Sequence, residues 1–129
     1  MILMDIDDFK LVNDRHGHQE GDRILIELAK VMVEQVRDSD VCCRFGGEEF
    51  LVILPFTGNP AEAYEIAERI RAKAMTIMCD GEGITISAGI AVCRQSIRSP
   101  RELIESADHA LYRAKRNGKN RVSLAPGHE

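Results

Sequence analysis

Helical and strand-like segments alternate along the whole chain, and this alternation determines the fold class. Apolar residues recur at helical spacing between residues 19 and 36. Two more helical segments begin at Pro60 and Pro100, since proline favours the first position of a helix. Short apolar runs typical of strands lie between the helices, at 2–6, 41–45, 50–54, 84–92 and 121–124. Without a linker or an internal repeat, the pattern predicts a single α/β domain.

Smaller elements complete the predicted order. We expect a short helix after the first strand, capped by Asp7 or Asp8, with Phe9 and Val12 facing inward. The polar, glycine-rich break between 41–45 and 50–54 predicts a hairpin. Three further short segments are a strand at 76–79, a turn at 80–83 and a frayed tail at 125–129.

Composition excludes several classes of function. The 129 residues include 21 acidic and 17 basic side chains, a net charge of −4, which disfavours non-specific nucleic-acid binding. No apolar run approaches the roughly 20 residues that span a bilayer, and the N-terminus does not resemble a signal peptide. The four cysteines fit no zinc pattern, so we expect reduced, core-facing thiols. A cytoplasmic location follows, either as a separate protein or as the cytoplasmic part of a larger or membrane-anchored one.

Carboxylates occur where apolar residues are expected. Asp5 interrupts an apolar strand, and Glu48 and Glu49 lie at the tip of the predicted hairpin. If the hairpin pairs with the first strand, these side chains converge and favour a divalent cation such as Mg²⁺. Two alternatives remain open from the residues alone: Asp5 and Asp7 as helix-capping acids, and Glu48 and Glu49 as a solvated turn. The preceding glycine pair, 46–47, fits either a tight turn or the close approach of a ligand.

Several segments together resemble a known family. Residues 44–50, Arg-Phe-Gly-Gly-Glu-Glu-Phe, look like the signature loop of GGDEF-domain diguanylate cyclases in its GGEEF form. Residues 5–14, 84–91 and 107–120 are similar to other motifs of that family, in the family's order. The resemblance implies an α+β, palm-like nucleotidyl cyclase fold with a central, mostly antiparallel sheet flanked by helices. It also implies a GGDEF domain over 1–124 that lacks the family's first helix.

The resemblance implies an activity and a set of site residues. The enzyme would condense two GTP into cyclic di-GMP and two pyrophosphates, with Mg²⁺ or Mn²⁺, by attack of a 3′-hydroxyl on an α-phosphate. Metal-binding and catalytic roles would fall to Asp5, Ile6 through its carbonyl, Glu48 and Glu49. Substrate-binding roles would fall to Phe9, Lys10, Asn13, Asp22, Leu25, Gly46, Gly47, Lys115 and Lys119.

Partners and regulation are implied in the same way. One GTP per chain requires a second copy of the chain, because the product has two identical linkages. Arg37, Asp40 and Arg69 match a site for inhibition by the product, although an Arg-x-x-Asp spacing alone fits a surface ion pair. We expect an upstream sensor or regulatory domain that is absent here. The alternative functions are a cyclic di-GMP receptor with little turnover and a GTP-binding regulatory domain.

Overall fold

A five-stranded sheet forms the centre of the molecule in the computed structural model, which describes residues 1–126. Its strand order is β2-β3-β1-β6-β7, antiparallel except for the parallel pair β6–β7. These strands are Val41–Arg44 (β2), Glu49–Ile53 (β3), Ile2–Ile6 (β1), Ile86–Ile90 (β6) and Val122–Leu124 (β7). The predicted mostly antiparallel sheet is therefore confirmed.

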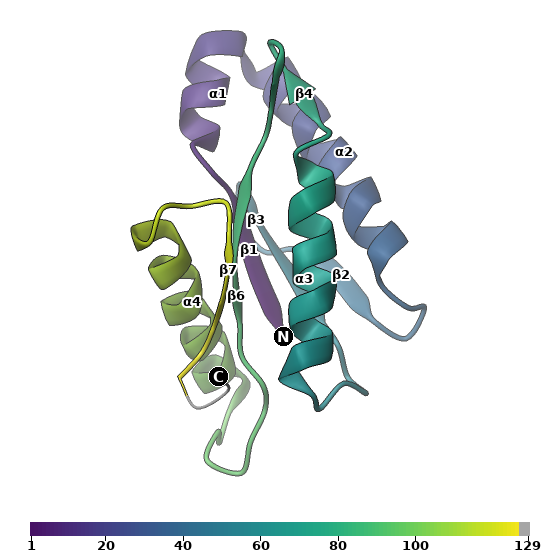
Figure 1. Cartoon of the computed structure of the whole chain (residues 1–129), viewed down its shortest axis with the longest axis vertical. Coiled ribbons are helices and arrows are strands. Elements are labelled where there is room, and N and C mark those ends of the chain that lie inside the picture. The colour runs from purple at the N-terminus through teal and green to yellow at the C-terminus, as the bar shows by residue number, and fades with distance from the viewer. Residues whose placement is uncertain (127–129) are drawn as a thin grey trace.

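Helices cover both faces of this sheet (Figure 1). Helix α2 (His18–Gln35) and helix α3 (Pro60–Ala74) lie on one face, and helix α4 (Pro100–Arg116) lies on the other. The short helix α1 (Phe9–His16) follows β1 and packs beside α2. A separate two-stranded hairpin, β4 (Met78–Cys79) and β5 (Glu82–Gly83), follows α3. The helices lie where the sequence predicts them, and their ends differ by one or two residues.

Strand β1 is the central strand, and every residue in it is buried. Its side chains alternate between the two faces, as the two-residue period of a strand requires. Ile2, Met4 and Ile6 enter the larger core with α2 and α3, whereas Leu3 packs beneath α4. Asp5 belongs by this alternation to the α4 face, at the end of the strand. An acid at this position needs a partner, since an unpaired buried carboxylate is costly.

Three predicted boundaries differ from the structure around the β4–β5 hairpin. The strand predicted at 76–79 covers only Met78–Cys79. The region predicted as a turn, 80–83, includes strand β5, because only Asp80 and Gly81 form the turn. Both have positive φ, 51° and 82°, as tight two-residue hairpin turns require. The predicted strand at 84–92 is shorter than expected and begins at Ile86.

The prediction for the start of α1 is wrong in its mechanism. Asp8 occupies the N-cap position in a left-handed conformation, φ 56°, and its side chain caps no backbone N–H. Asp7 does not cap the helix either, since other groups engage its carboxylate. The caps at the other predicted starts have ordinary geometry: Asn59 accepts from the Ala61 N–H, and Ser99 accepts from the Glu102 N–H.

The cysteine and tail predictions need correction. All four cysteines are free, and the half-buried Cys42 and Cys79 pack against the larger core as expected, but Cys43 and Cys93 are exposed, so the prediction of core-facing thiols is wrong for these two. Cys43 lies on the edge strand β2. Ala125, expected in the frayed tail, is buried and donates its N–H to the Ile90 carbonyl at 2.8 Å. Residues 127–129 of that tail lie outside the described residues.

Within residues 1–126, no helix is both long and apolar enough to cross a membrane.

Candidate functional site

Three predicted site carboxylates converge at the end of β1. Asp5 is paired in register with Glu49 of β3, and the Ile6 N–H donates to the Glu48 carbonyl at 3.4 Å. The β2–β3 hairpin therefore pairs with the first strand, as the carboxylate hypothesis requires. Burial raises the pKa of Glu48 and of Glu49, and the negative charge of Asp5 raises each further. Close carboxylates of like charge are stabilised either by binding a proton or by holding a cation between them.

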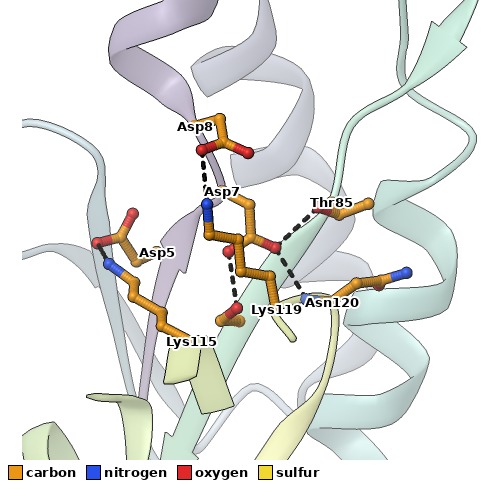
Figure 2. A network of polar contacts seen from close by, with 8 residues as sticks. Asp5, Asp7, Asp8, Thr85, Lys115, Lys119 and Asn120 are labelled. Carbon is orange, nitrogen blue, oxygen red and sulfur yellow. Dashed lines mark hydrogen bonds and ion pairs between the residues drawn. The ribbon is translucent and has the colours of Figure 1, made fainter. Parts of the chain in front are cut away.

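Two lysines from the C-terminal part of the chain reach this cluster. Lys115 Nζ donates to Asp5 Oδ2 at 2.5 Å, and Lys119 Nζ donates to Asp8 Oδ1 at 2.7 Å (Figure 2). Burial raises the pKa of Asp5 despite the opposing effect of Lys115. The second oxygen of this carboxylate, Asp5 Oδ1, is buried and has no hydrogen-bond partner. Asp5 is thus only half satisfied, with one oxygen available to a further positive group.

In this arrangement no three His, Cys, Asp or Glu side chains among residues 1–126 form a group that could hold a metal ion. The position beside Asp5 Oδ2 is instead held by the Lys115 ammonium. Asp7, the other acid of this strand end, accepts three hydrogen bonds from protein groups. The acid cluster that sequence suggests is therefore divided: Asp5 faces Lys115, whereas Asp7 is engaged within the fold.

Two adjoining pockets, which we call the cleft, lie between α1, the β2–β3 hairpin and the end of α4. The first, about 230 Å³, is lined by Asp5, Ile6, Asp7, Asp8, Phe9, Lys10, Glu48, Lys115 and Lys119. The second, about 420 Å³, is lined by Phe9, Lys10, Asn13, His18, Asp22, Leu25, Arg44, Gly47 and Glu48. Phe9, Lys10 and Glu48 border both. The fold thus gathers eleven of the predicted metal-binding and substrate-binding residues around one cleft, while Gly46 and Glu49 are absent from its lining.

The second pocket carries an unsatisfied acceptor. Asn13 Oδ1 is buried without a hydrogen-bond partner. Helix α2 approaches it closely at Gly21, where a Cβ would overlap Asn13 Oδ1 and lie 3.1 Å from Phe9 Cζ. Glycine is therefore required at this contact between α1 and α2. An amide oxygen beside the exposed Asp22 carboxylate provides two acceptors for a ligand with neighbouring N–H donors.

Two residues in the second pocket have no role in the sequence prediction. Arg44 donates from Nε to the Gly46 carbonyl at 3.1 Å and from Nη2 to the Gly47 carbonyl at 2.6 Å, so it holds the glycine turn. The signal was available, since Arg44 begins the quoted loop motif. His18 begins α2 beside the pocket, and no spacing in the sequence distinguishes it from a surface histidine.

The two glycines of the loop differ in their surroundings. A Cβ at Gly46 would lie 3.0 Å from Glu49 Oε2, so the Glu49 side chain folds back beside this glycine. The charge of Asp108 in α4 also raises the pKa of Glu49. At Gly47 a Cβ would meet nothing within 4 Å, and this glycine borders the cleft. Gly46 therefore accommodates Glu49, whereas Gly47 leaves the cleft open.

The predicted inhibitory residues lie near the end of α2. Asp40 Oδ2 accepts from the Arg37 backbone N–H at 2.8 Å, and Arg37 Nη2 donates to Thr57 Oγ1 at 2.5 Å. Arg69 reaches the same stretch from α3 and donates to Gln35 Oε1 at 3.2 Å. Asp40 Oδ1 is buried without a partner. The fold thus brings Arg69 to the segment 35–40, which contains Arg37 and the unsatisfied carboxylate oxygen of Asp40.

Comparisons with known proteins point to one family. The family profile "Diguanylate cyclase, GGDEF domain" matches residues 1–121. Diguanylate cyclase A of Treponema denticola is 43% identical over 129 residues, which cover 97% of this chain and 34% of the relative. The chain spans about a third of the length of such curated relatives.

Solved structures with the same fold are also similar in sequence. The active GGEEF domain of a diguanylate cyclase from Vibrio cholerae superposes with a TM-score of 0.89 at 37% identity, over 96% of this chain and 80% of that one. The GGDEF domain of DgcB from Caulobacter crescentus, in complex with c-di-GMP, gives a TM-score of 0.88 at 35% identity, over 95% and 75%.

Proposed function

The chain belongs to the GGDEF family of diguanylate cyclase domains, and we propose that it binds GTP in the cleft and condenses two GTP into cyclic di-GMP and two pyrophosphates. One observation carries this proposal. One end of the cleft is lined by carboxylates and lysines, and its buried Asp5 Oδ1 has no hydrogen-bond partner. The other end is lined by the Asn13 amide and the Asp22 carboxylate, and its buried Asn13 Oδ1 also has no partner. A nucleotide has a matching polarity, with phosphates at one end and base N–H groups at the other.

The residues of the first pocket fit a divalent cation. Asp5 and Glu48 offer carboxylate oxygens and Ile6 a carbonyl oxygen, which are the hard ligands that Mg²⁺ and Mn²⁺ prefer. A cation held there would offset the burial and like charge that raise the pKa of Asp5 and Glu48, and would give Asp5 Oδ1 a partner. We assign Asp5, Ile6 and Glu48 as metal-binding residues, with Glu49 as a further ligand or as a base. When bound, the cation supplies positive charge to the phosphate oxygens.

The remaining residues of the cleft divide between base and phosphates. We assign Asn13 and Asp22 to the guanine edge, whose N1–H and N2–H₂ groups are donors, and Leu25 to packing against the base. Phe9 and Lys10, at the start of α1, lie between the two pockets and are suited to contact the triphosphate. Lys115 and Lys119 would exchange their carboxylate partners for phosphate oxygens.

The chain's main contribution to the reaction is to position the substrates. A 3′-hydroxyl oxygen bonds to the α-phosphorus, the bond to pyrophosphate breaks, and the hydroxyl proton must be accepted. Glu49, paired in register with Asp5, is the carboxylate that we assign to accept this proton if it is not a metal ligand, and the partner is a GTP held by a second copy of the chain. We expect the reaction to take place in the cytoplasm, where GTP is available, in a protein longer than this chain.

Pyrophosphate release from GTP with Mg²⁺ tests the enzyme hypothesis. The chain is fused to a dimerising partner so that two clefts can meet, and an established diguanylate cyclase serves as the positive control. We expect cyclic di-GMP from the fusion, at least a hundredfold less from Glu48→Gln, and no change in Glu62→Gln, an exposed glutamate of α3. GTP binding without any product would favour the GTP-binding regulatory domain instead.

A second candidate, a cyclic di-GMP receptor, is favoured by the arrangement at the end of α2. The segment 35–40 contains Arg37 and Asp40, and Arg69 of α3 donates a hydrogen bond to its first residue, Gln35. Asp40 Oδ1 remains without a hydrogen-bond partner. Titration calorimetry with cyclic di-GMP should show binding that weakens about tenfold or more in Arg37→Ala, since hydrogen bonds to charged groups contribute about 1.5–3 kcal/mol. Arg101→Ala, which removes an exposed arginine of α4, is the matched control. Equal binding by both variants would exclude this site.

A further inference from the structure

Asp7 is a buried acid between β1 and α1 that has no part in the assigned chemistry. Its side chain accepts hydrogen bonds from Thr85 Oγ1 at 2.7 Å, Ser87 Oγ at 2.7 Å and the Asn120 backbone N–H at 3.0 Å. The residue is 8% exposed. Figure 2 shows this carboxylate between Thr85, which lies just before β6, and the turn that carries Asn120. Thr85 and Ser87 lie near the start of β6, the strand that pairs with β1. Asn120, in contrast, joins Asp7 to the turn between α4 and β7.

That turn has an unusual backbone. Gly118, Lys119 and Asn120 have positive φ values of 125°, 63° and 47° in succession. Side chains other than glycine disfavour this region, so the conformation persists only where surrounding bonds hold it. The Lys119 N–H donates to the Ala114 carbonyl at 3.0 Å, and Arg71 Nη1 donates to Asn120 Oδ1 at 2.9 Å. The Asp7 bond to the Asn120 N–H ties the same turn to the end of β1.

The two lysines of the cleft lie in or next to this turn. Lys119 lies within it, and Lys115 lies in the last turn of α4 just before it. Both ammonium groups meet carboxylates that flank Asp7 in sequence, Asp5 and Asp8. The position of Lys119 therefore depends on what holds the turn against Asp7, whereas Lys115 is also placed by the packing of α4 on the sheet.

We propose that Asp7 is a positioning residue for triphosphate binding: through the Asn120 N–H it fixes the α4–β7 turn, and so places Lys119 beside Lys115 at the phosphate end of the cleft. The assignment rests on the proposed GTP site. Asp7 touches no substrate in this role and acts through the turn. The guanine end of the cleft, at Asn13 and Asp22, is formed by α1 and α2 and does not depend on this bond.

Calorimetry with two probes tests this role in the intact chain with Mg²⁺. The probes are 3′-deoxy-GTP, which lacks the attacking hydroxyl and cannot be condensed, and GMP, which lacks the two outer phosphates. We expect Asp7→Ala to weaken 3′-deoxy-GTP binding about tenfold and GMP binding less than twofold, since the loss falls on lysine–phosphate contacts. Asp7→Asn should restore most of the affinity, because its amide oxygen can accept from Asn120 while its NH₂ donates to Ser87.

A matched control separates the turn from the rest of the network. Thr85→Val removes one donor to Asp7 but leaves the Asn120 bond, and we expect an unchanged ratio of the two affinities. If Asp7→Ala does not fold, Asp7→Ser serves the same test, because it keeps a hydroxyl beside Ser87 but lacks the Oδ2 atom that accepts from Thr85 and Asn120.

The outcomes are distinct. Equal losses for both probes in the Asp7 variants, or no loss, would overturn the positioning role and leave the GTP site intact. If the unaltered chain binds 3′-deoxy-GTP no better than GMP, the proposed GTP site itself fails, and this assignment fails with it.

Discussion

Lys115 and Asp5, 110 residues apart in the sequence, form an ion pair with 2.5 Å between Nζ and Oδ2. The lysine comes from the last turn of α4 and the aspartate from the central strand, so the pair joins both sides of the cleft (Figure 2). It places a positive charge of the protein itself beside a carboxylate that we assign to a metal. We therefore expect cation binding at Asp5 to compete with Lys115 until phosphates offer the lysine another partner.

The raised pKa of Glu48 predicts an unusual pH dependence of stability. Between the ordinary value of 4.5 and the raised value, the folded state binds more protons than the unfolded state. The contribution of Glu48 is therefore fully present below pH 4.5 and is lost as the pH rises through the folded-state pKa. In metal-free urea titrations from pH 4 to 8, the wild type should lose stability relative to Glu48→Gln as the pH rises. A difference independent of pH would contradict the raised pKa, and Glu62→Gln is the control.

Binding of Mg²⁺ should offset the loss of folding stability that the carboxylate cluster causes. At pH 7.5, Mg²⁺ at ten times its dissociation constant should stabilise the chain by about 1.4 kcal/mol. For a domain of this size, that corresponds to a rise in Tm of about 5 °C, measurable by differential scanning calorimetry. Asp5→Asn should abolish the rise, because it removes a ligand. Lys115→Met should keep it, because it removes only a competitor. An equal rise in Asp5→Asn would show that the cation binds elsewhere.

Selection of guanine is predicted to depend on Asp22. Its carboxylate lies beside Asn13 in the second pocket and suits the two N–H donors of guanine, which adenine does not present in that pattern. Asp22→Ser should reduce the preference for GTP over ATP at least tenfold in competition binding. Asp14→Ser, which removes an exposed acid of α1 outside the cleft lining, should not change it. An unchanged preference in the Asp22 variant would disprove the assignment.

Two glycine substitutions should differ in their effects on stability. Gly21→Ala places a methyl group on Asn13 Oδ1, and such overpacking costs about 1–3 kcal/mol. Gly47→Ala meets no atom within 4 Å, so its unfolding free energy should stay within about 0.5 kcal/mol of the wild type. GTP affinity should still fall in Gly47→Ala, because this glycine borders the cleft. Unfolding curves and GTP titrations of both variants check the two halves of this prediction.

Periodicity in the sequence was enough to place most of the fold. The helical spacing from 19 to 36 and the prolines at 60 and 100 predict the three long helices, since both signals are local. The pairing of β2–β3 with β1 could be stated only as a condition, because strand order is set by non-local packing. Local rules failed at Asp8, where a strained turn replaces the expected cap, and at Ala125, which a backbone bond to Ile90 keeps in the fold.

The residues of the candidate site were likewise only partly predictable from the sequence. Asp5, Glu48, Asn13 and Asp22 could be singled out because their motifs are short and contiguous in sequence. The role of Asp7 could not be read, because its three partners lie 78 to 113 residues away. Its neighbour Asp5 has the same chemistry but meets a lysine in place of three neutral donors.

The sequence by itself determined the elements, the family and the kinds of side chain available for chemistry, because propensity, periodicity and motif are written in neighbouring residues. Tertiary structure decided which acid is left half satisfied in the cleft and which is engaged in the fold. It also decided that Lys115, at the end of α4, and Lys119 face the end of β1, the latter because a turn of three residues with positive φ returns the chain to Asp7. Such contacts depend on distances between remote segments, and only packing sets those distances.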